Sequence, residues 1–277
     1  MRQLIINKNP DKNGLVIIEG KDYRYLRQVL RVKTGDMVNL RLPDGTLCGS
    51  TAAKIDEKSK KITLQLCASI AASSESSITR GVQASELEEQ AAGGDGIEYT
   101  LFQFSPKPQK MEIIVRQATE CGVKNIVPVI SEYTEKGSVA AFEKNHGERF
   151  ERIVREARQQ SGSPVSTTIF EPVTVEEALK LWQELAAEGT GAAGFILSER
   201  NDGCKTVRQA LETERSKQEG VCPSKIAIVC GNEGGISPEE LELWVKKGLF
   251  YPVHFSVNIL RCETAALYGI AAVQTGV

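Results

Sequence analysis

The sequence predicts an α/β protein of two domains, a small N-terminal β-barrel and a larger domain built around a mainly parallel sheet. Two observations predict this division. In residues 1–67, short strand-like runs are separated by turn residues, whereas in residues 98–277 apolar runs alternate with helical patterns. Apolar strands separated by helices are typical of a parallel sheet covered on both faces. With 41% hydrophobic and 25% charged residues, the composition is that of an ordinary globular protein.

The N-terminal domain, residues 1–67, is predicted to be a barrel because its strand-like runs are short and end at Gly, Pro and Asp. These runs are RQLIIN, MVNLRL, TLCGSTAAKI and KITLQLC. The sequence Pro43-Asp44-Gly45 predicts a hairpin connection between two of them.

One helix is predicted within this domain, at residues 21–31. Its apolar face is formed by Leu26, Val29 and Leu30. Its arginines recur at helical spacing on another face, and they are Arg24, Arg27 and Arg31. Because the planar guanidinium suits phosphate oxygens, we predict that these arginines bind an RNA backbone. A solvated face without a partner is the alternative.

The segment 68–97 is rich in Ala, Ser, Gly and Glu, contains no aromatic residue and offers little apolar surface to bury. It is predicted to be a flexible linker or loop between the two domains.

The C-terminal domain, residues 98–277, alternates strands and helices in a βαβ rhythm. Strands are predicted at 99–105, 125–130, 167–170, 194–199, 225–231 and 250–256. Helices are predicted at 109–121, 147–160, 174–187, 205–214 and 238–247, with a last helix from about Arg261. In such sheets, ligands bind beyond the carboxyl ends of the strands.

The charge is unevenly distributed, although the net charge is only −2. Residues 1–61 hold 13 Lys/Arg against 7 Asp/Glu, a net of +6, whereas residues 62–98 have a net of −5. A basic module of this size can follow a phosphate backbone even when the rest of the protein is acidic. Chance clustering on a solvated surface is the alternative interpretation.

The cysteines and histidines argue against a disulfide framework and a metal site. Seven cysteines are scattered without a CxxC pair, and there are only two histidines. The sequence also has neither a signal peptide nor an apolar run of about 20 residues that could cross a membrane. We therefore expect a cytoplasmic protein that has no metal and does not bind membranes.

A glycine-rich turn, Gly231-Asn232-Glu233-Gly234-Gly235-Ile236, follows the apolar strand KIAIVC. Ser237, Pro238 and Glu240 then predict a helix start with a capping box. The glycines let a ligand approach the main chain closely. Their spacing matches neither the dinucleotide GxGxxG pattern nor a GxxxxGK[ST] phosphate loop. A purely structural turn is the alternative.

A second polar segment, residues 258–267 (NILRCETAAL), leads from a strand into the last helix. It contains one cation, Arg261, which either serves a ligand or simply neutralises Glu263 or a neighbouring helix terminus. The helix that follows is apolar on nearly all sides, which predicts burial against other helices or across a dimer interface.

Taken together, VCGNEGGISPEELE and NILRCETAALYGI resemble the closing signature of the RsmE family. These are SPOUT-class enzymes that methylate N3 of a uridine in small-subunit ribosomal RNA. Further matching blocks are YLRQVLRVKTGD, KMEIIVRQATECGVKNIVPVISEYT, RFERIVREARQQSG and GFILSE, so the resemblance covers nearly the whole chain apart from the linker.

The resemblance implies a PUA-like RNA-binding barrel and a SPOUT α/β domain that ends in a trefoil knot. It also implies a homodimer that acts on 16S ribosomal RNA, within the small subunit, with bent S-adenosylmethionine as methyl donor. The donor-binding positions carried over from the family are Leu197, Ser198, Glu199, Gly231, Asn232, Glu233, Gly234, Gly235, Ile236, Ile259, Leu260, Arg261 and Thr264.

For the chemistry, we predict that Arg261 stabilises negative charge on a uracil carbonyl, and we take Glu233 as the candidate general base. Two alternatives stay open. One is another SPOUT RNA methyltransferase, acting on a ribose 2′-hydroxyl or a transfer-RNA base. The other is a catalytically silent RNA-binding assembly factor.

Three positions depart from the family pattern. Asn232 stands where proline is common, Cys262 stands where threonine is common, and an arginine usual near Ser163 is missing. The missing arginine removes one contact expected with RNA or with a partner subunit. The other two changes leave the glycines and Arg261 intact, so we expect donor binding to persist.

Overall fold

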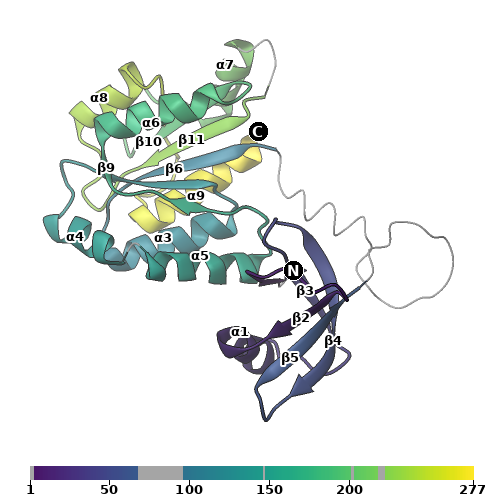
Figure 1. The fold of residues 1–277 in the computed structure, drawn as a ribbon. Helices are drawn as coiled ribbons and strands as arrows, with labels where there is room; N and C mark the ends of the chain where they lie inside the picture. Colours follow the sequence, from purple (N-terminus) through teal and green to yellow (C-terminus); the bar gives the residue numbers. More distant parts are fainter. Residues whose placement is uncertain (1–2, 68–95, 146, 201–202, 218–221) are drawn as a thin grey trace. The chain divides into compact units, whose positions relative to one another are not determined.

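A computed structural model describes residues 3–67, 96–145, 147–200, 203–217 and 222–277 (Figure 1). The chain divides into two compact units. The first comprises Met1–Gly93 and Arg158–Pro164, and the second comprises Gly94–Ala157 and Val165–Val277. The predicted linker at 68–97 lies, except for its last two residues, outside the described residues. Within the described ranges, no helix combines the length and the apolar character needed to cross a membrane.

The first unit contains a five-stranded sheet in the order β1-β3-β4-β5-β2. Its strands are β1 (Gln3–Ile5), β2 (Leu15–Ile18), β3 (Met37–Arg41), β4 (Leu47–Asp56) and β5 (Lys61–Leu66). The strands β1 and β3 are parallel, and the other neighbours are antiparallel. The two edge strands, β1 and β2, do not pair with each other, so the described strands form an open sheet rather than the predicted closed barrel.

The predicted helix of this unit is shorter than expected, and its second half is a π-helix rather than an α-helix. It consists of α1 (Gly20–Arg24) and a π-helical turn, η1 (Tyr25–Val29), in which the Leu30 N–H donates to the Tyr25 carbonyl at 3.0 Å. Leu26 is fully buried as predicted, but Val29 is 56% exposed, because a π-helical turn changes which residues share a face. Arg31 lies beyond the helix in the left-handed region, with φ 56°.

The second unit contains a seven-stranded sheet in the order β12-β10-β11-β6-β7-β8, with β9 also pairing with β7. Every pair of neighbours is parallel, as the apolar strands predicted. The strands are β6 (Glu98–Phe104), β7 (Asn125–Ile130), β8 (Thr168–Ile169), β9 (Val173–Thr174), β10 (Ala192–Leu197), β11 (Lys225–Cys230) and β12 (Tyr251–Val253).

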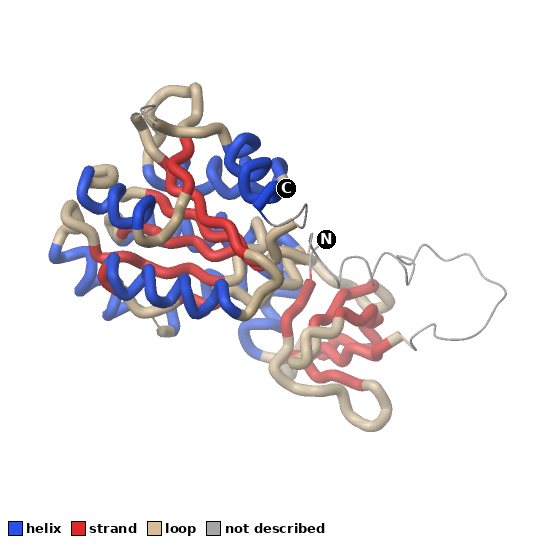
Figure 2. The backbone as a smooth tube through the Cα atoms, turned by 90° about the horizontal axis from the view of Figure 1, so that it is seen from above, coloured by secondary structure: helices blue, strands red, loops and turns tan. Residues whose placement is uncertain are grey.

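Helices cover both faces of this sheet (Figures 1 and 2). They are α3 (Pro108–Glu120), α4 (Lys136–Asn145), α5 (Glu148–Ser161), α6 (Val175–Ala187), α7 (Val207–Lys217), α8 (Pro238–Lys246) and α9 (Cys262–Gly276). Residues of α3, α7 and α9 share one hydrophobic core, and residues of α6 and α8 share the other. The second core is aromatic, with the Trp244 ring 5.2 Å from Phe102 and 4.7 Å from Phe250. This packing holds the carboxyl ends of the strands in fixed positions.

Candidate functional site

A cavity of about 760 Å³ opens at the carboxyl ends of β10, β11 and β12. This volume is within the range of small-molecule sites. Three loops supply most of its wall, namely those that follow β10, β11 and β12, and the rest comes mainly from α8, from the first residues of α9 and from Lys110 on α3. The cavity therefore lies where a parallel sheet is expected to bind its ligand.

The glycine-rich loop between β11 and α8 has the backbone geometry that its sequence predicts. Gly235 lies in the left-handed region, with φ +80°, and its N–H donates to the Asn232 carbonyl at 3.1 Å. At Gly234, an added Cβ would lie 2.6 Å from the Cβ of Tyr133, so a side chain does not fit there. Both glycines are therefore required by the path of this loop.

The start of α8 anchors the same loop. Ser237 Oγ accepts from the Glu240 N–H, and Glu240 Oε2 accepts from the Ser237 N–H, so the predicted capping box is present. The other oxygen of Glu240 accepts from the Glu132 N–H at 2.8 Å. One buried carboxylate thus ties α8 to the segment that follows β7.

Asn232 fixes the glycine-rich loop through both ends of its amide. Its Oδ1 accepts from the Gly234 N–H at 2.9 Å, and its Nδ2 donates to Ser131 Oγ at 3.2 Å. Such a side-chain bond to the main chain two residues on is typical of Asn in turns. The side chain that replaces the family's proline therefore holds the loop by its own contacts.

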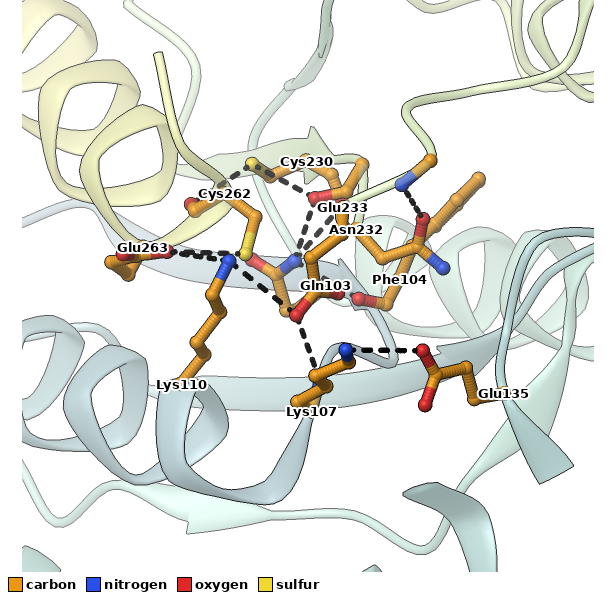
Figure 3. Close-up of polar contacts among 12 residues, drawn as sticks. Gln103, Phe104, Lys107, Lys110, Glu135, Cys230, Asn232, Glu233, Cys262 and Glu263 are labelled. Carbon is orange, nitrogen blue, oxygen red and sulfur yellow. Dashed lines mark hydrogen bonds and ion pairs between the residues drawn. The ribbon is translucent and has the colours of Figure 1, made fainter. Parts of the chain in front are cut away.

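Lys110 connects two of the cavity loops (Figure 3). Its Nζ lies 3.4 Å from Glu233 Oε1 in the loop after β11 and 3.4 Å from Glu263 Oε2 in the first turn of α9. Glu233 Oε1 also accepts from the Lys107 N–H at 3.2 Å, at the N-terminus of α3, where the helix dipole favours a negative charge. This oxygen is therefore engaged by a cation and an N–H group, and the role of Glu233 as a general base stays a prediction.

The ionisation of this cluster follows from the same contacts. Burial alone would lower the pKa of Lys110, but the negative charges of Glu233 and Glu263 raise that pKa. Burial opposes ionisation of Glu263, but hydrogen bonds from its own N–H and from the Cys262 thiol, together with Lys110, lower its pKa. Lys110 and Glu263 are therefore both charged at neutral pH.

The two cysteines beside this cluster keep their protons. Burial, a hydrogen bond to Glu263 and the charge of Glu233 raise the pKa of Cys262 to about 12. Burial likewise raises the pKa of Cys230, whose thiol donates to the Cys262 carbonyl at 3.7 Å. Neither thiol is a nucleophile near neutral pH.

Arg261 is the N-cap residue of α9, and its side chain lines the cavity. Its main-chain carbonyl accepts from the N–H groups of Thr264 and Ala265. Among the described residues, its guanidinium has no hydrogen-bond or ion-pair partner, and Glu263 pairs with Lys110 instead. The alternative in which Arg261 simply neutralises Glu263 is therefore wrong, and the cation is available to a ligand.

The structure brings together nearly all of the predicted donor-binding residues. Twelve of the thirteen line this one cavity, and the exception is Thr264, which lies in the first turn of α9 outside the lining. Sequence reasoning assigned no role to two other residues in the wall, Lys110 and His254. His254 Nδ1 lies 3.1 Å from the Ser198 carbonyl oxygen, which links the loops after β12 and β10.

The three arginines predicted to bind RNA do not form one stripe. Arg27 donates from Nη1 to the Val32 carbonyl at 2.7 Å and forms an ion pair with Glu57 at 2.7 Å. Arg24 and Arg31 are exposed, but only Arg24 belongs to the helix. Arg27 is thus committed to the fold of its own unit, and the prediction of RNA binding now rests on the other two.

A sequence model of the RNA methyltransferase domain matches residues 95–274, which is well over half of the chain. The chain belongs to the RNA methyltransferase family. It is 25% identical to ribosomal RNA small subunit methyltransferase E 2 of Borreliella burgdorferi, over 98% of this chain and 96% of that protein. It is 33% identical to ribosomal RNA small subunit methyltransferase E of Aquifex aeolicus, over 61% of this chain and 65% of that protein.

Solved structures share the fold of this RNA methyltransferase over nearly its full length. A ribosomal RNA small subunit methyltransferase E from Neisseria gonorrhoeae, bound to S-adenosylmethionine, superposes with a TM-score of 0.71 at 23% identity. That comparison covers 99% of this chain and 97% of the other. A putative methyltransferase from Legionella pneumophila, in complex with the same cofactor, has a TM-score of 0.66 at 22% identity, with 99% and 98% of the two chains covered.

Proposed function

We propose that this protein transfers the methyl group of S-adenosylmethionine to N3 of a uridine in 16S ribosomal RNA of the small ribosomal subunit. One observation carries the proposal. The loops after β10, β11 and β12 surround a single cavity with twelve of the thirteen predicted donor-binding residues. The names of the relatives support the substrate, and the donor in a neighbour of the same fold supports the cofactor.

The residues of the cavity fit this donor. Its volume of about 760 Å³ is sufficient, and Leu197, Ile236, Ile259 and Leu260 provide apolar surface for an adenine ring. The glycine-rich loop exposes main-chain groups that a ligand can approach closely. When bound, S-adenosylmethionine supplies a methyl group on a cationic sulfur.

We assign to Arg261 a contact with the uracil base. When the N3 proton passes to a general base, for which Glu233 in the cavity wall is the candidate, the negative charge left on the uracil is shared with the two neighbouring carbonyl oxygens. A guanidinium without a protein partner can donate hydrogen bonds to such an oxygen, and this contact strengthens as the charge develops. Arg261 thereby stabilises the reacting form of the base, while the loops hold both reactants in reach of each other.

Finer features of the family complete the proposal. We infer a trefoil knot in the last section of the chain, a PUA-like role in RNA binding for the first unit, and a homodimer as the active form. For the knot, β12 lies beside β10 although β11 comes between them in sequence. For the dimer, Tyr268 on α9 and the nearby Ile259 are 42% and 81% exposed. A ribosomal substrate implies a cytoplasmic location.

The test is incubation of the protein with unmodified small subunits and labelled donor, followed by mass spectrometry of the nucleosides. N3-methyluridine is the expected product. A 2′-O-methylated nucleoside, or methylation of transfer RNA in its place, would assign the chain to another reaction. Donor binding without any transfer would identify a silent RNA-binding factor.

The Arg261→Ala variant tests the residue in the same assay. Turnover should fall by about 100-fold, because an electrostatic contact to the developing charge is lost. Affinity for the donor, measured by calorimetry, should change much less. Arg208→Ala is the matched control, because Arg208 is an exposed arginine on α7 that pairs with Glu212 outside the cavity. Turnover by Arg261→Ala close to that of the control would exclude this role.

A further inference from the structure

The position of Lys110 decides which cation the carboxylates of the cavity contact. Glu233 and Glu263 approach from different loops, and both meet the Lys110 ammonium at 3.4 Å. The three side chains are partly buried, with exposed fractions of 26% for Lys110, 32% for Glu233 and 17% for Glu263. Such a cluster is screened less by solvent than a surface ion pair.

Arg261 is the competing cation. It stands two residues before Glu263, at the same end of α9, and its guanidinium has no partner among the described residues. An arginine and a carboxylate form strong, often bidentate hydrogen bonds when neither has another partner. In this structure, Glu263 is instead held by Lys110 and by the Cys262 thiol, which donates to Oε2 at 3.4 Å.

We infer that Lys110 is a positioning residue that withdraws Glu263 from Arg261 and so keeps the Arg261 guanidinium available to the substrate. The inference rests on the proposed function, because it assumes that Arg261 contacts the uracil. It goes beyond that function by giving a task to a residue on α3, outside the three loops that form most of the cavity wall. Lys110 acts through Arg261 and touches neither reactant in this scheme.

A purely structural role for Lys110 makes a different prediction. If Lys110 only tied the two loops together, its loss would be harmful whatever the charge at residue 263. If it withdraws a competing carboxylate, removal of that carboxylate should repair the loss. Glu263 is the better choice for this test than Glu233, because the Lys107 N–H continues to hold Glu233 when Lys110 is replaced.

The experiment compares wild type, Lys110→Met, Lys110→Arg, Glu263→Gln and the double variant Lys110→Met/Glu263→Gln. Lys110→Met should lower kcat by about fivefold, the factor that a partly exposed ion pair corresponds to. The donor Kd should change less than kcat. Lys110→Arg should retain turnover, and the double variant should be faster than Lys110→Met alone. Arg149→Met is the control, since it removes a cation that pairs with α3 at Glu112 outside the cavity.

A second readout follows the guanidinium directly and does not depend on activity. Phenylglyoxal modifies arginines that are accessible and unpaired, and peptide mass spectrometry reports the rate at residue 261. The rate should fall in Lys110→Met and recover in the double variant. Thermal unfolding of each variant shows whether the fold is intact.

Two results would overturn the inference, namely a double variant as slow as Lys110→Met, or a Lys110→Met variant with wild-type kcat and wild-type modification of Arg261. Failure of the proposed function is recognised separately. In that case the wild type would not methylate the small subunit, while the modification rates would still report whether Lys110 withdraws Glu263.

Discussion

Asn232 shows how one side chain can determine the shape of a binding loop. Its amide connects the Gly234 N–H with Ser131 Oγ, and the side chain is only 6% exposed. Proline at this position would stiffen the main chain, whereas asparagine achieves order by hydrogen bonds. The order of the loop before the donor arrives therefore depends on these two contacts.

We predict that Asn232→Ala weakens binding of S-adenosylmethionine by about tenfold, because two buried hydrogen bonds that hold the loop are lost. Titration calorimetry measures this affinity. Ser131→Ala is the matched control, since it removes the bond to Nδ2 but leaves the bond between Asn232 and Gly234, and it should have the smaller effect. An unchanged affinity in Asn232→Ala would mean that the loop is ordered by its glycines and the α8 cap alone.

The thiol of Cys262 lies where a reactive cysteine would be harmful. It lines the cavity in which we propose that the methyl donor binds, and burial together with Glu263 and Glu233 raises its pKa to about 12. Since the thiolate is the nucleophile, the proton protects this cysteine from methylation and alkylation.

We therefore predict that iodoacetamide near neutral pH modifies the exposed Cys67 and Cys222 but leaves Cys262 unmodified. The rate at Cys262 should rise as the pH approaches 12, because a raised pKa delays formation of the thiolate. Peptide mass spectrometry gives the rate at each residue, and denatured protein, in which every cysteine should react, is the control. Equal rates at Cys262 and Cys222 in the folded protein would contradict the prediction.

At the scale of elements, the N-terminus of α8 connects the glycine-rich loop to the segment that follows β7. Both oxygens of Glu240 accept hydrogen bonds from main-chain N–H groups, one at Ser237 and one at Glu132. An amide in place of the carboxylate would turn an NH₂ group toward one of these donors.

We predict that Glu240→Gln lowers the free energy of unfolding by about 1–3 kcal/mol, because one buried N–H loses its acceptor. Glu239→Gln is the control, since Glu239 occupies the same turn of α8 but is exposed. This substitution should lower the free energy of unfolding by only a few tenths of a kcal/mol. Urea unfolding measures both values. Equal stabilities of the two variants would show that Glu240 contributes nothing beyond the helix dipole.

The elements that could be predicted from the sequence are those with local signals. Ser237 with Pro238 marked the start of α8, and the apolar runs marked the strands of the second unit. The π-helical turn was missed, because the apolar spacing of Leu26, Val29 and Leu30 is that of an ordinary α-helix. The ion pair of Arg27 with Glu57 was also missed, because the two residues are 30 positions apart and no local pattern links them.

The order of strands explains what was missed at the site. Lys110 follows β6, and it reaches the glycine-rich loop because β6 lies next to β11 in the sheet. Their sequence separation exceeds a hundred residues, and no local pattern reveals which strands become neighbours. The loops after β11 and β12 were indicated by their own glycine-rich and polar residues, whereas the loop after β10 was predicted only from the resemblance to a family.

At the scale of the whole molecule, the basic residues of the N-terminal segment and the cavity belong to different units. Residues 1–61 carry a net charge of +6, whereas the cavity belongs to the second unit. A basic unit can supply affinity for a phosphate backbone, and a cavity can supply chemistry at one base. This division predicts that RNA affinity and donor affinity respond to different substitutions.

We predict that the double variant Arg24→Ala/Arg31→Ala binds 16S ribosomal RNA more weakly and with a flatter dependence on salt. Each phosphate contact that is lost removes about 0.7–0.9 from the slope of log affinity against log salt, so the pair should remove about 1.5. Arg27→Ala is the matched control, because its guanidinium already binds Glu57 and the Val32 carbonyl. It should lower the stability of the first unit and leave the slope nearly unchanged. Fluorescence anisotropy with labelled RNA over a range of salt concentrations gives the slopes, and calorimetry gives the donor affinity, which should be the same in all three proteins. A steep, wild-type slope in the double variant would move the RNA contacts away from this helix to other basic residues of the chain.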